Sequence, residues 1–235
     1  MACRLFDSLN PPEDSKLIAH TNQKKIMTGG LTGRDRQIIL DLALKARLMT
    51  ASQISNHYFN SKPQIANRRL RFLLANGWLE ATSVVAPEPP SILRPFYRGE
   101  QGIEKPNFSR LSKLLFARAR SRLMVRQSIV RVSPKSLLLV LGVKRCCKSP
   151  HHQVGHDIGM AEVVLWLKRM SPNDYHNLVG EDTLSSNAFP GFLPDAIVKR
   201  GDRIHVVEFG GAYDVSRLRL IDDSCNRMEV SYDLY

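Results

Sequence analysis

The sequence predicts an α/β (α+β) chain in two parts, the first helical and basic and the second acidic with strands. Charge separates along its 235 residues: residues 1–150 hold 26 Lys and Arg against 9 Asp and Glu, whereas residues 151–235 hold 8 against 13. Apolar residues recur at helical spacing between Leu31 and Asn76. Two strand-like apolar runs with a Gly-Asp turn between them follow residue 190.

Composition narrows the class of protein. The net charge of +12 and its separation indicate a nucleic-acid-binding half joined to an acidic half. The longest apolar run, residues 137–141, is too short to cross a membrane, and Met1–Asp7 lacks the apolar region of a secretion signal. Four cysteines without framework spacing favour reduced thiols, so we expect a cytoplasmic protein. The cluster Cys146, Cys147, His151, His152 and His156 lacks the usual zinc spacing, and we expect ordinary loop and core residues there.

Residues 1–30 carry Pro and Gly punctuation with little apolar periodicity, which predicts a tail or arm. Three helices are expected next, each with a recognisable terminus signal. They are Gly33–Arg47 capped by Thr32, Ala51–Phe59 capped by Thr50, and Lys62–Asn76 with Pro63 in its first turn and Gly77 after its end.

Two strands, Trp78–Val85 and Ile92–Arg98, are expected around a proline-rich loop. Three helices followed by a hairpin predict a winged helix over residues 31–105. In such a fold the helix 62–76 would enter the major groove, where Gln and Asn pair with adenine and Arg with guanine, while the wing holds phosphates. The predicted DNA-binding residues are Lys62, Gln64, Asn67, Arg68, Arg69 and Arg71 on the helix and Arg94 and Arg98 on the wing.

The remainder divides into a basic connector, residues 106–150, and an α/β domain, residues 151–235. In the connector, Asn107–Arg126 predicts one or two basic helices, and Ser136–Lys144 is ambiguous between helix and strand. In the last domain we expect a helix at His156–Met170, strands at Phe192–Lys199 and Arg203–Phe209 around a Gly201-Asp202 turn, and helical structure over Val215–Tyr235.

Two carboxylates lie on this strand hairpin, Asp195 after Pro194 and Glu208 near the end of the second strand. Carboxylate oxygens are the ligands that Mg²⁺ and Mn²⁺ prefer. The spacing resembles the PD-(D/E)-x-K nuclease superfamily, whose motif places Asp on one strand and Glu-x-Lys on the next. The resemblance implies a restriction-endonuclease-like domain with Asp195 and Glu208 as metal ligands and Glu162 as a helical acid.

One position departs from that motif. Gly210 stands where the superfamily has its catalytic lysine, and glycine can neither orient water nor stabilise developing charge. Lys199 is the nearest other lysine. We therefore expect a degenerate site that does not cleave DNA and binds no cofactor, with Mg²⁺ or Mn²⁺ needed only if the nuclease is active.

The whole order of motifs resembles the replication-relaxation family of plasmid and mobile-element proteins, from Leu31 to the last residue. The motifs are the winged helix, His156-Asp157, Pro194-Asp195, Val206-Val207-Glu208, and a closing segment with Tyr232 and Tyr235. The resemblance implies sequence-specific binding of double-stranded DNA in plasmid or mobile-element replication or conjugative mobilisation. The nuclease-like domain would serve dimerisation, or docking to a relaxase or replication initiator. Two alternatives stay open: a metal-dependent DNA endonuclease using Glu162, Asp195 and Glu208, and a winged-helix transcriptional repressor.

Overall fold

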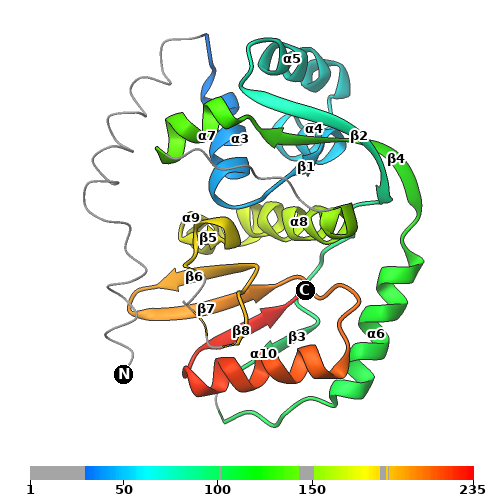
Figure 1. The fold of residues 1–235 in the computed structure, drawn as a ribbon, viewed down its shortest axis with the longest axis vertical. Coiled ribbons are helices and arrows are strands. Elements are labelled where there is room, and N and C mark those ends of the chain that lie inside the picture. The colour runs from blue at the N-terminus through cyan, green and yellow to red at the C-terminus, as the bar shows by residue number, and fades with distance from the viewer. Residues whose placement is uncertain (1–29, 101, 143–150, 186–188, 190) are drawn as a thin grey trace. The chain divides into compact units, whose positions relative to one another are not determined.

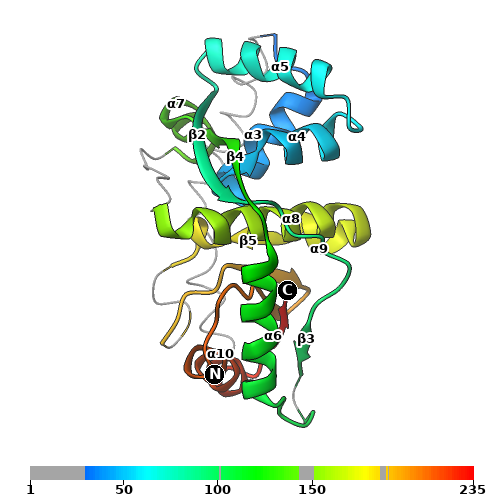
Figure 2. The ribbon, with the colours of Figure 1, turned by 90° about the vertical axis from the view of Figure 1, so that its right-hand side faces the viewer.

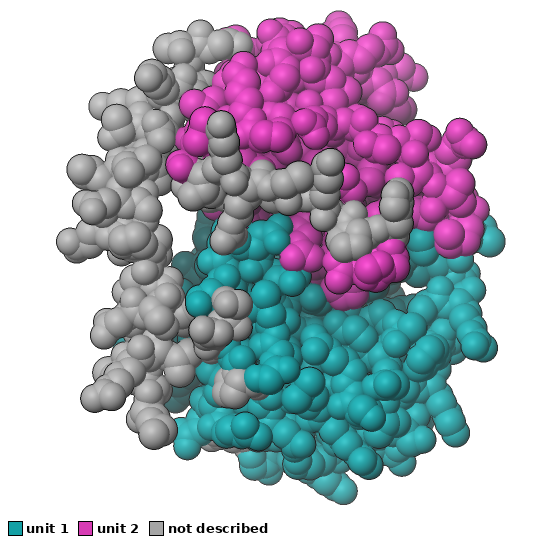
Figure 3. All heavy atoms as spheres, in the orientation of Figure 1, with its two compact units in different colours: residues 1–9, 87–123, 162–235 teal, residues 10–86, 124–161 magenta. Residues whose placement is uncertain are grey.

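The computed structural model of the chain describes residues 30–100, 102–142, 151–185, 189 and 191–235. The chain forms two compact units (Figure 3): unit 1 comprises residues 1–9, 87–123 and 162–235, and unit 2 comprises residues 10–86 and 124–161. Both are mixed α/β, with one sheet of three strands and one of five. The predicted tail and the pair Cys146-Cys147 lie outside the described residues.

Unit 2 begins with the three predicted helices, which are confirmed (Figure 1). They are α3 (Gly33–Leu44), α4 (Ala51–Tyr58) and α5 (Pro63–Ala75). Thr32 and Thr50 each close a capping box, with Asp35 and Gln53 respectively, and so satisfy main-chain groups at the helix starts. Pro63 lies in the first turn of α5. Gly77 follows this helix at φ 67°, the left-handed conformation that glycine adopts without strain.

The three-stranded sheet of unit 2 has the order β1 (Met49–Thr50), β4 (Met124–Val132), β2 (Leu79–Pro87). The predicted first wing strand is confirmed as β2. Of the second, Ile92–Arg98, only Tyr97 and Arg98 form a strand, and that strand belongs to the five-stranded sheet, so its assignment to the wing is wrong. Its place is taken by β4, whose Ile129, Val130 and Val132 are buried and whose Val130 lies opposite Met49. The predicted segment is interrupted by Pro95, which has no N–H to donate to a ladder.

The expected basic connector is therefore not one structural element. Its first part forms α6 (Phe108–Ser121) in unit 1, and its second part forms β4 and α7 (Pro134–Leu141) in unit 2. The ambiguous segment Ser136–Lys144 is therefore helical as far as Leu141, and its residues 143–144 lie outside the described residues. The short 3-10 helix η1 (His151–Gln153) precedes α8 (Val154–Met170), which begins in unit 2 and ends in unit 1.

Unit 1 contains a five-stranded sheet, and α9 (Pro172–His176) and the 3-10 helix η2 (Glu181–Thr183) lie before and after its edge strand β5 (Leu178–Gly180) in the chain. The strand order is β3 (Tyr97–Gly99), β8 (Ser231–Leu234), β7 (Arg203–Glu208), β6 (Ala196–Arg200), β5. Strands β7 and β8 run parallel and the other pairs antiparallel. The predicted hairpin is confirmed as β6 and β7, although its first strand begins at Ala196 and not at Phe192. Ala196 lies opposite Val207, and the turn is at Gly201.

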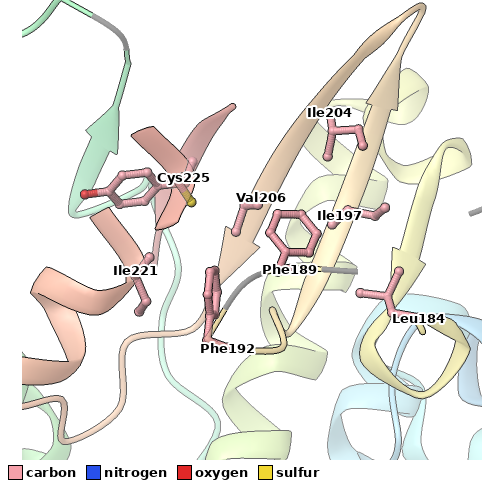
Figure 4. Packing of buried hydrophobic residues seen from close by; sticks show 9 residues of the cluster. Leu184, Phe189, Phe192, Ile197, Ile204, Val206, Ile221 and Cys225 are labelled. Atoms are coloured by element: carbon pink, nitrogen blue, oxygen red, sulfur yellow. The ribbon is translucent and has the colours of Figure 1, made fainter. Parts of the chain in front are cut away.

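Helices cover both faces of this sheet (Figures 1 and 2). On one face, Ile197 and Val206 pack with Ile221 and Cys225 of α10 (Val215–Arg227), as Figure 4 shows. On the other face, the ring of Trp166 in α8 lies 5.4 Å from that of Tyr235. The expected helix over Val215–Tyr235 is confirmed only as far as Arg227. The rest is wrong, because residues 231–234 form β8, which fills the space between β3 and β7.

Candidate nucleic-acid interface and carboxylate pair

The outer face of α5 carries the polar and basic side chains that the sequence singled out. Ala66, Leu70 and Leu73 are buried, and they define the inner face of the helix. At 100° per residue the outer residues fall within an arc of about 100° on the opposite side. They are Gln64, Asn67, Arg68 and Arg71, all exposed, and the exposed Lys62 precedes the helix as its N-cap residue.

Arg69 differs from these neighbours because its half-buried side chain is engaged by other residues of unit 2. Its Nε lies 2.8 Å from Asp35 Oδ1, its Nη2 donates to the Gly30 carbonyl at 2.7 Å, and the group stacks 4.2 Å from the centroid of the Phe72 ring. Burial raises the pKa of Asp35, but hydrogen bonds from Arg69 and Thr32 outweigh it and leave that pKa lowered. Arg69 thus fixes α5 against the start of α3.

Arg94 and Arg98, the two predicted wing residues, both lie in unit 1 and not on the wing strands. Arg94 is exposed in the segment before β3, whereas Arg98 lies in β3 and donates from Nε to Asp233 Oδ1 at 2.7 Å. The strand that does occupy the wing position, β4, carries an exposed Arg126 that sequence reasoning assigned to a helix. The signal in the sequence that could have identified this strand is its run of β-branched residues, Val125, Ile129, Val130 and Val132.

The charge of the chain separates by unit more clearly than by halves of the sequence. Unit 2 contains 17 Lys and Arg against 6 Asp and Glu, and unit 1 contains 17 against 16. The whole excess, apart from one charge, therefore belongs to the unit that contains α5. An excess of this kind attracts polyanions over distances of about a Debye length.

Asp195 and Glu208 lie at the adjoining ends of β6 and β7, as the sequence predicts. Glu208 is fully buried, and its Oε1 accepts from the Asp195 N–H at 3.0 Å. Asp195 Oδ2 in turn accepts from the Phe209 N–H at 2.8 Å, so each carboxylate holds the main chain of the other strand. Tyr213 donates its hydroxyl to Glu208 Oε2 at 3.0 Å, and Arg217 Nη2 lies 4.0 Å from the same oxygen. Burial and the two carboxylates raise the pKa of Tyr213 well above its usual value.

The position of the absent lysine is filled. A Cβ added to Gly210 would lie 2.8 Å from Leu115 and 2.9 Å from Leu234. The Gly210 carbonyl accepts from Arg118 Nη2 at 2.5 Å, and the same nitrogen donates to the main-chain oxygen of Tyr235 at 2.7 Å. Burial, together with the neighbouring Arg122, lowers the pKa of Arg118 to about 10. The guanidinium of Arg118 in α6 thus lies near the end of β7, but it donates to main-chain carbonyl oxygens and not to Asp195 or Glu208.

The other two residues of the expected nuclease site lie elsewhere. Lys199 is opposite Ile204 near the far end of β6, four residues beyond Asp195, which is about 13 Å along a strand. Glu162 is half-buried in α8. Over the part of the chain that the structure describes, no group of three or more His, Cys, Asp or Glu residues is placed to hold a metal ion. The structure therefore does not gather Glu162, Asp195 and Glu208 into a metal site.

A polar cluster around the buried Asp233 on the same sheet was not anticipated from the sequence. His205 Nε2 lies 3.1 Å from Asp233 Oδ2, and His205 Nδ1 lies 2.7 Å from Ser231 Oγ. Burial raises the pKa of Asp233, but hydrogen bonds with His205 and Arg98 outweigh it, so this pKa is lowered. The cluster joins β3, β8 and β7 by side chains as well as by the main chain.

No helix in the described residues is both long and apolar enough to span a bilayer. Comparison of the chain with family models, with curated proteins and with solved structures gives no match.

Proposed function

We propose that the chain is a sequence-specific double-stranded DNA-binding protein in which α5 lies in the major groove and β2 and β4 form the wing. The observation that carries the proposal is the outer face of α5, where two amides and two guanidinium groups stand exposed opposite the buried face. Gln64 and Asn67 match the donor and acceptor pattern of adenine, and Arg68 and Arg71 match that of guanine. Lys62 and Arg126 would contact phosphates.

The connection between α4 and α5 supports this role because it is tightly ordered. Asn60 and Ser61 adopt left-handed conformations at φ 51° and 56°, and the Ser61 N–H donates to the Ser55 carbonyl at 3.1 Å. Arg69 and Asp35 then fix the other side of α5. A helix held at both its start and its side presents base-contacting groups with little entropy left to lose on binding.

For unit 1 we propose a role in dimerisation or partner docking without DNA cleavage. Asp195 directly precedes β6 and Glu208 ends the adjacent β7, close to the arrangement that the restriction-endonuclease resemblance implies, which favours a nuclease-like ancestry of the fold. Their oxygens nevertheless accept main-chain N–H groups, and the space beside Gly210 is occupied. The setting in plasmid or mobile-element replication or mobilisation, with a relaxase or replication initiator as partner, rests on the resemblance to the replication-relaxation family. A repressor of transcription would use the same face of α5.

The test is selection of bound duplexes from a randomised double-stranded library by the full chain. We expect an enriched motif, and we expect Arg68→Ala to weaken binding to it by about 1–3 kcal/mol, roughly 5- to 150-fold. Arg219→Ala, which removes an exposed charge from α10, is the matched control and should bind as the parent does. Selection without any enriched motif would refute sequence-specific binding.

The same preparation tests the absence of cleavage. Bound duplex incubated with Mn²⁺ should remain intact, as it does with EDTA. Cutting that requires Mn²⁺ and disappears in Asp195→Ala would show that unit 1 is a nuclease, and the docking role would then be wrong.

A further inference from the structure

The inner face of helix α6 packs against other elements of unit 1, and these contacts determine which residues of the helix face outward. Leu111 and Leu115 are buried against Leu218 and Leu234, and Ser112 donates its hydroxyl to the Tyr213 carbonyl at 2.9 Å. The guanidinium of Arg118 lies between two rings, 4.5 Å from the Phe96 centroid and 4.6 Å from that of Phe209. The helix cannot rotate without breaking these contacts.

The outer face of α6 carries a stripe of three exposed cations, Arg110, Lys113 and Arg120. At 100° per residue they fall within an arc of about 80°, and Ala117 lies between them. No Asp or Glu occurs from Asn107 to Arg122. None of the three cations forms an ion pair with another described residue, whereas Arg98, Lys105 and Arg200 of the same unit each pair with an aspartate.

We propose that this α6 stripe is a second DNA contact, one that binds the phosphate backbone of a duplex without reading its sequence. The inference rests on the proposed function of α5. The stripe runs from Arg110 to Arg120, a rise of about 15 Å along the helix. A duplex presents one negative charge per about 1.7 Å of its axis, so several phosphates face the stripe in any register. Side chains that can only donate and that carry no acidic neighbours suit such a repeating polyanion.

The experiment measures the salt dependence of binding by the full chain in which Arg110→Gln, Lys113→Gln and Arg120→Gln are combined. Two duplexes are used, the selected motif and a scrambled version. Because each phosphate contact contributes about 0.9 to the slope of log K against log salt, the slope should become less steep by up to about 2.7 on both duplexes. The preference for the motif over the scrambled duplex should stay unchanged, since the stripe reads no bases.

The matched control combines Arg203→Gln, Arg219→Gln and Arg227→Gln, three exposed cations of the same unit. It removes the same charge and should keep the parent's slope. The inference is overturned if the control makes the slope less steep by the same amount, or if the α6 variant keeps the parent's slope. In either case the stripe is not a phosphate contact, and the proposed role of α5 in binding DNA is unaffected. If the parent binds neither duplex, the proposed function fails first. Unchanged thermal midpoints would show that both variants remain folded.

Discussion

Gly210→Ala tests whether the position of the absent lysine is filled by packing. The added Cβ would lie 2.8 and 3.0 Å from the two Cδ atoms of Leu115 and 2.9 Å from a Cδ atom of Leu234. Carbon atoms pack best at about 3.5–4.0 Å, so each contact is roughly 0.5–1 Å too short. Overpacking of this kind costs about 1–3 kcal/mol, and the lower chain entropy of Ala in the unfolded state returns about 0.4–1 kcal/mol. We expect a net loss of about 1–2 kcal/mol.

The assay is urea unfolding, in which a loss of that size moves the midpoint by roughly 0.5–1 M at a slope of about 2 kcal/mol per molar. Gly33→Ala is the control, because no atom lies within 4 Å of its added Cβ and it begins a helix. In a Leu115→Ala background, which is itself less stable, Gly210→Ala should cost less than in the parent. A Gly210→Ala variant as stable as the parent would refute the packing argument.

Two further predictions concern ion pairs. Since hydrogen bonds with His205 and Arg98 lower the pKa of Asp233 in the folded state, this group stabilises the fold above its unfolded pKa of about 3.9 and loses that stabilisation as the pH falls through the folded pKa. Asp233→Asn should therefore lower the free energy of unfolding at pH 7, and this free energy should fall less steeply below about pH 4 than it does in the parent. Urea unfolding at several pH values measures both effects, and an equally steep fall in the variant would contradict the prediction. Arg69→Gln leaves the fully buried Asp35 without its charged partner and should lower the free energy of unfolding by about 2–3 kcal/mol. Arg71→Gln, on the outer face of α5, should change the free energy of unfolding by less than about 0.5 kcal/mol but weaken DNA binding. Equal stability of the two glutamine variants would rule out the role given to Arg69.

The helices of unit 2 could be predicted because the residues that begin and end a helix lie within a few positions of it in the sequence. Thr32 and Thr50 cap as expected, and Gly77 ends α5, since each of these residues satisfies main-chain groups of its own helix. Sheet membership could not be predicted in the same way. The choice between Ile92–Arg98 and Met124–Val132 as the second wing strand depends on a partner far away in sequence, and β4 pairs with β1 through Val130 and Met49.

The candidate site shows the same limit. The sequence placed Asp195 and Glu208 on one hairpin, and that arrangement is confirmed, because the turn at Gly201 sets the register locally. The roles of the carboxylate oxygens depend on Phe209, Tyr213 and the inserted α6, whose positions follow from the three-dimensional packing of unit 1. A motif therefore located the pair of acids but did not reveal what they bind.

One helix, α6, both fills the space beside Gly210 and carries the α6 stripe. Leu115 occupies the space beside Gly210, and Arg118 takes the carbonyl oxygens at the end of β7, so α6 closes the strand end at which a nuclease of this kind would act. The same contacts turn Arg110, Lys113 and Arg120 outward. The helix that fills the space beside Gly210 thus also presents cations that suit a phosphate backbone, in keeping with the proposal that unit 1 holds DNA without cutting it. Because one helix carries both properties, displacing α6 with Gly210→Ala should alter the salt dependence of DNA binding along with the stability of unit 1.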